Sequence, residues 1–87
     1  MLKIFKYLLQ PLTRQGLHLP KDAVVLTAQM QGSDLCLWVQ MEDTRPCTEL
    51  RMFEVYATGD DLPNEPRRYI ATVQRGHYVW HVYESTP

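Results

Sequence analysis

Six short segments in which apolar and polar residues alternate account for most of this 87-residue chain. Alternation with a period of two is typical of half-buried antiparallel strands. No stretch keeps a helical period, so we predict an all-β fold of about six antiparallel strands, arranged as a small barrel or a two-sheet sandwich. The predicted strands are Lys3–Leu9, Ala23–Gln31, Leu35–Glu42, Glu49–Ala57, Arg68–Arg75 and Tyr78–Glu84.

The residues between these segments predict turns and loops. Gly32-Ser33-Asp34 is predicted to be a three-residue hairpin turn, and Gly76-His77 a two-residue turn with Gly first, as a type II′ turn prefers. Residues Leu12–Lys21 contain Gly16 and Pro20 and are predicted to be a connector. In the second segment, the alternation predicts one face made of Val24, Leu26, Ala28 and Met30.

Length and composition fit one small β-domain over residues 1–87. The chain is 45% hydrophobic and 22% charged, which is ordinary for a folded protein, and its net charge of −1 provides no strong field for nucleic acid or an anionic membrane. Nothing in the sequence indicates a targeting or membrane-spanning segment, so a cytoplasmic location is expected. Cys36 and Cys47 are therefore expected to be reduced thiols.

The sequence does not contain a recognisable catalytic or metal site. Cys36 lies in the middle of a predicted strand, where a buried structural thiol is the usual outcome. The segment Thr58–Asp61 lacks the lysine and the following helix of a phosphate-binding loop. His77 and His81 would lie about 13 Å apart along a strand, too far to share a metal ion. We therefore predict a protein that is not an enzyme and needs no metal or cofactor.

The sequence is compatible with two kinds of binding, to single-stranded nucleic acid or to a protein partner. Small antiparallel barrels bind single-stranded nucleic acid through exposed aromatic and basic side chains. The last hairpin offers Tyr69, Tyr78, Trp80, Arg67, Arg68 and Arg75 for this, but the acidic loop Asp60–Glu65 adjoins it and weighs against nucleic acid. Binding to a protein partner is the other kind, because both faces of the last segment, and the segment that carries Trp38, have more apolar surface than one small core needs.

The chain resembles, over almost its whole length, a family of short uncharacterised proteins of tailed bacteriophages and prophages. The resemblance implies a bacterial host cytoplasm as the setting, supplies no catalytic motif, and draws attention to Thr58-Gly59 and Trp80-His81. The segments that carry it are, in order, Ile4–Tyr7, Leu19-Pro20, Leu35–Trp38, Thr58-Gly59, Tyr69–Val73 and Trp80–Glu84.

Together these features predict a phage accessory protein that acts by stoichiometric binding. It would counter host defence by binding a host protein or by sequestering a nucleotide-type signal, and a homo-oligomer is expected with the second role. The alternatives are a single-stranded nucleic-acid-binding barrel and a structural or interaction protein of the virion or prophage. In the nucleotide hypothesis, amides at Thr58 and Gly59 and the guanidinium groups of Arg67 and Arg68 hold phosphates. The indole of Trp38 or Trp80 stacks on a base, and His81 completes the candidate site residues.

Overall fold

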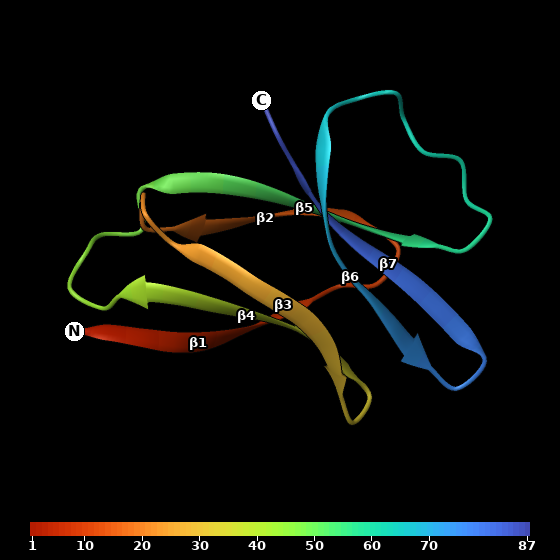
Figure 1. Cartoon of the computed structure of the whole chain (residues 1–87), viewed down its shortest axis with the longest axis horizontal. Coiled ribbons are helices and arrows are strands. Elements are labelled where there is room, and N and C mark those ends of the chain that lie inside the picture. Colours follow the sequence, from red (N-terminus) through yellow and green to blue (C-terminus); the bar gives the residue numbers. More distant parts are fainter.

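The computed structural model describes residues 1–87 and contains seven strands and no helix (Figure 1). The predicted all-β fold is therefore confirmed. The strands form two antiparallel sheets that pack as a sandwich, so of the two predicted arrangements the sandwich is correct and the closed barrel is wrong. The strands are β1 (Leu2–Leu9), β2 (Arg14–Leu19), β3 (Val24–Gln31), β4 (Asp34–Glu42), β5 (Glu49–Ala57), β6 (Arg67–Arg75) and β7 (Tyr78–Ser85).

The first sheet has three strands in the order β1-β4-β3, and the second has four in the order β2-β5-β7-β6. In the first sheet, β4 is the central strand and the register runs from Leu2 opposite Glu42 to Leu9 opposite Leu35. In the second sheet, β7 lies between β5 and β6. This placement explains why both faces of β7 are apolar or aromatic: it is an internal strand, half-buried even on its outer face.

Strand β2 corrects the prediction of a connector over Leu12–Lys21. It pairs with β5 from Arg14 opposite Glu54 to Leu19 opposite Glu49. In Arg14–Leu19, the alternation of apolar and polar residues is short and is interrupted by Gly16. The sequence pattern therefore did not predict this strand. A Cβ atom at Gly16 would lie 2.7 Å from Leu50 Cδ1, so an alanine there would displace the exposed Leu50 side chain.

The hairpin formed by β3 and β4 differs from the prediction in two ways. Gln31 pairs with Asp34, so the turn consists of two residues, Gly32 and Ser33, and not of three. A β-bulge between Val25 and Thr27 shifts the register, so that Val25 faces the core while Val24 and Leu26 are exposed. The predicted face that grouped Val24 and Leu26 with Ala28 and Met30 is therefore wrong.

The hydrophobic core lies between the two sheets. Phe53 of β5, Leu37 and Val39 of β4 and Val82 of β7 are completely buried there. Cys36 is also buried, on the other face of β4, whereas Cys47 is exposed, and both are free thiols. The chain forms no helix of the length and hydropathy needed to cross a membrane.

A buried ion-pair cluster joins the two sheets at one edge of the core. Arg51 of β5 donates two hydrogen bonds to the carboxylate of Glu84 on β7, at 2.6 and 2.9 Å, and a third, at 2.5 Å, to the carbonyl of Ala23, which precedes β3. Arg68 of β6 approaches the same carboxylate at 3.0 Å. Burial alone would raise the pKa of Glu84, but the hydrogen bonds and charges of Arg51 and then Arg68 outweigh it, so this pKa lies below its ordinary value.

Candidate functional site

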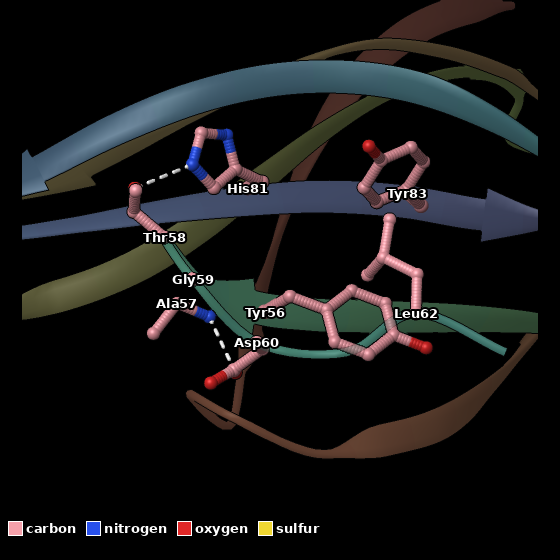
Figure 2. Close-up of a pocket in the computed structure, with 8 residues that line it drawn as sticks. All are labelled: Tyr56, Ala57, Thr58, Gly59, Asp60, Leu62, His81 and Tyr83. Carbon is pink, nitrogen blue, oxygen red and sulfur yellow. Dashed lines mark hydrogen bonds between the residues drawn. The ribbon is translucent and has the colours of Figure 1, made fainter.

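A small open pocket lies on the outer face of the four-stranded sheet, where the chain leaves β5 (Figure 2). Its volume is about 190 Å³. Strand alternation builds it: Tyr56 points outward because Val55 points into the core, and His81 and Tyr83 point outward on either side of Val82. We call this site the tyrosine pocket; its lining residues are Tyr56, Ala57, Thr58, Gly59, Asp60, Leu62, His81 and Tyr83.

His81 connects three segments at the pocket. Its Nε2 lies 2.8 Å from the hydroxyl of Thr58, which follows β5, and its Nδ1 lies 3.0 Å from the hydroxyl of Tyr69 on β6. Tyr69 is further bonded to Thr72. Each hydroxyl donates or accepts as the imidazole tautomer requires, so both ring nitrogens are satisfied and the ring orientation is held.

The turn after β5 exposes both a free donor and free acceptors. Gly59 has φ of +95°, a backbone conformation that favours glycine, and its N–H donates no hydrogen bond to another backbone group. One carboxylate oxygen of Asp60 accepts the N–H of Ala57 at 2.8 Å, which fixes the turn (Figure 2). Asp60, Asp61 and Glu65 are exposed and form no ion pair. Of these three, Asp60 lines the pocket and gives it a negative charge.

Arg67 lies against the tyrosines of the pocket and forms an ion pair with Glu54. Its guanidinium carbon is 5.7 Å from the ring centroid of Tyr83 and 6.0 Å from that of Tyr56. Its Nε lies 3.4 Å from the carboxylate of Glu54, which is only 2% exposed and also accepts hydrogen bonds from Tyr56 and Ser85. Burial raises the pKa of Glu54. The hydrogen bonds from Ser85 and Tyr56 and the charge of Arg67 together lower it by more, so the pKa lies below its ordinary value.

The lowered pKa values of Glu54 and Glu84 predict that the protein loses stability in acid. A carboxyl whose pKa is lower in the folded state stabilises the fold fully above its unfolded pKa, about 4.3 for Glu, and this contribution is lost as the pH falls through the folded pKa. We therefore expect the melting temperature to fall steadily below roughly pH 4.5. Thermal unfolding followed by circular dichroism from neutral pH downward measures this, and Glu54→Gln should flatten the slope. A melting temperature unchanged across that window would contradict the assignment.

The polar groups of the pocket resemble a catalytic arrangement only in part. The distances along Thr58, His81 and Tyr69 match a nucleophile, a base and an orienting group. However, the third group is a neutral phenol, and it supplies no negative charge to stabilise an imidazolium. The aromatic walls, the hydroxyl and imidazole groups, the free amide and the carboxylates instead offer contacts to a group that carries both apolar surface and hydrogen-bond donors.

The structure brings together some of the predicted site residues and separates the others. Thr58, Gly59 and His81 all line the tyrosine pocket, and Arg67 lies beside it. The tyrosines of the pocket, Tyr56 and Tyr83, and the rim residue Asp60 were not predicted as site residues. Alternation places Tyr56 on the face opposite Val55, but it does not contain the register that pairs β5 with β7 and brings Tyr56 close to Tyr83.

Three predicted site residues lie elsewhere. Arg68 is engaged with Glu84 at the edge of the core, and Trp80 is 6% exposed and belongs to the core between the sheets. Trp38 lies on the outer face of the three-stranded sheet, in register with Lys6 and Thr27. That face carries apolar side chains that are 44–59% exposed: Leu2, Ile4, Leu8, Val24 and Leu26.

Fold and site together define a small antiparallel β-sandwich with an aromatic pocket on the outer face of one sheet. The chain matches, over residues 1–87, the family described as "Domain of unknown function (DUF7352)", and it belongs to that family. Comparisons with curated proteins and with solved structures found no match.

Proposed function

We propose that this protein acts by stoichiometric binding, without catalysis, and that the tyrosine pocket receives a basic side chain of a partner protein. The observation that carries the proposal is the pairing of two tyrosine rings with the carboxylate of Asp60 at one small pocket, with Asp61 and Glu65 following in the same loop. Aromatic rings attract ammonium and guanidinium groups, and carboxylates strengthen that attraction.

Size and charge favour a side chain over a whole nucleotide. A pocket of about 190 Å³ is smaller than the roughly 300–1,000 Å³ typical of sites for complete small molecules. Asp60, Asp61 and Glu65 would repel phosphates, and Arg67 and Arg68 are both held in ion pairs within the chain. The nucleotide hypothesis therefore has less support than protein binding.

The proposal keeps the biological setting predicted from the sequence. In a phage or prophage context, the partner is a host protein, and holding it counters a host defence pathway in the bacterial cytoplasm. The exposed apolar face around Trp38 and Ile4 supports a second contact, either with the same partner or with another copy of the chain.

Capture of a partner from bacterial lysate, compared between two charge variants, tests this proposal. In the first variant, Asp60→Asn, Asp61→Asn and Glu65→Gln neutralise the pocket residue Asp60 and the two other acidic residues of the loop after β5. We expect it to bind the captured protein about tenfold more weakly, because several exposed charge pairs of up to about 1 kcal/mol each are lost. The matched control changes Asp34→Asn and Glu49→Gln, which are exposed carboxylates outside the pocket, and it should bind like the wild type.

Two results would overturn the proposal. One is a partner that binds both charge variants equally well. The other is a melting temperature raised by several degrees by a nucleotide, and no longer raised after Arg67→Ala, which would favour nucleotide sequestration. Binding to a single-stranded oligonucleotide that weakens steeply with salt would instead favour the nucleic-acid alternative.

A further inference from the structure

A second, larger pocket is lined by residues of the β1–β2 connection and of the β6–β7 hairpin. Its volume is about 620 Å³, within the roughly 300–1,000 Å³ typical of small-molecule sites. It is separate from the tyrosine pocket, because Tyr78 and Trp80 point to the opposite face of β7 from His81. Its lining residues are Leu12, Arg75, Gly76, His77, Tyr78 and Trp80.

Trp80 contributes a polar group that lacks a partner. Trp80 is only 6% exposed, and its indole Nε1–H is fully buried with no hydrogen-bond acceptor. It is the one buried side-chain nitrogen or oxygen of the chain in this condition. Buried polar groups almost always have a partner, so this donor, on a side chain that lines the cavity, is available to an acceptor.

Two exposed side chains, Tyr78 and Leu12, line the same pocket as Trp80. Tyr78 is 67% exposed, and its ring stacks on Trp80 with centroids 6.4 Å apart and an interplanar angle of 27°. Leu12 has φ of +57°, which is uncommon for a residue other than glycine. Backbone strain of this kind concentrates at ligand sites, where the surrounding structure sustains it.

The charge at this pocket is opposite to that of the tyrosine pocket. Arg75 is exposed and forms no ion pair, His77 lies next to it along the turn, and no acidic residue lines the cavity. An unpaired guanidinium group beside apolar walls matches a ligand with an apolar body and a carboxylate head.

We propose that this pocket binds a small amphipathic carboxylate with an aromatic or branched apolar body. The body packs between Leu12, Tyr78 and Trp80, and the carboxylate pairs with Arg75. Displacement of Leu12 or Tyr78 brings a ligand oxygen to the Trp80 indole, which then gains its missing acceptor.

Nuclear magnetic resonance of the two tryptophan indole groups tests the proposal directly. The ¹⁵N-labelled protein is titrated with 3-phenylpropionate and with naphthalene-2-carboxylate, and the variant Trp38→Phe assigns the two indole signals. We expect the Trp80 Nε1–H signal to move while that of Trp38 stays in place. The neutral analogue 3-phenylpropanamide should bind about tenfold more weakly, because the charge-assisted bond is lost.

An arginine variant and a matched control decide whether the site is the one proposed. Arg75→Ala, an exposed change that leaves the core intact, should weaken carboxylate binding about tenfold, while Lys21→Ala removes one unpaired positive charge elsewhere and should leave it unchanged. Equal binding by Arg75→Ala and wild type would overturn the proposal. So would a Trp80 signal that does not move with either carboxylate.

Discussion

Replacing Glu84 with alanine is expected to lower the free energy of unfolding by about 3 kcal/mol. The carboxylate is 8% exposed and accepts two hydrogen bonds from Arg51, whose side chain is only 18% exposed. Without Glu84, the guanidinium charge of Arg51 stays in a largely buried position with only the carbonyl of Ala23 as a partner. Urea denaturation followed by tryptophan fluorescence measures the loss.

The matched control for this prediction is Arg68→Ala. Arg68 contacts the same carboxylate, but its side chain is 55% exposed, so water screens the pair and its loss should cost at most about 1 kcal/mol. Equal losses for Glu84→Ala and Arg68→Ala would show that the cluster is not organised around a buried Arg51–Glu84 pair.

Replacing Phe53 with alanine is expected to cost about 3–5 kcal/mol. The ring is completely buried between the sheets and belongs to the core formed with Leu37, Val39 and Val82. The smaller side chain leaves a cavity, because two packed sheets do not collapse fully to fill it. For a chain of this size, such a loss is a large part of the total stability, so the melting temperature should fall by more than ten degrees.

Ile4→Ala is the matched control for the core substitution. Ile4 is 58% exposed on the outer face of the three-stranded sheet, so its truncation should change the free energy of unfolding by no more than about 0.5 kcal/mol. A loss at Ile4 close to that at Phe53 would mean that the outer face is covered in solution, for example by a second copy of the chain.

Prediction from the sequence succeeded where a strand alternates without interruption. In β5, the alternation of the sequence separates Phe53 and Val55 from Met52 and Tyr56, and the structure has the same two faces, because side chains on consecutive strand residues point to opposite faces. It failed at the bulge near Leu26, where one extra residue reverses the faces that follow, and at β2, whose segment offers little alternation. The local sequence pattern predicts neither the bulge nor β2, because both depend on pairing with the neighbouring strand.

The candidate site was only partly accessible from the sequence for the same reason. Thr58 and His81 were named, yet their contact at 2.8 Å exists because β5 pairs with β7. Tyr56 and Tyr83, with ring centroids 6.0 Å apart, meet across the same two strands. Trp80 was one of two candidates, with Trp38, to stack on a base, but its side chain lies in the core between the sheets.

The amino-acid sequence by itself therefore determined that the chain folds into antiparallel strands, with faces readable wherever the alternation of apolar and polar residues is regular. Only the tertiary structure decided that these strands form an open sandwich, that a seventh strand joins it, and that tyrosines, His81 and an acidic turn converge on one pocket. The physical reason is that alternation reflects the local geometry of one strand, whereas pairing and register depend on contacts between residues far apart in the chain.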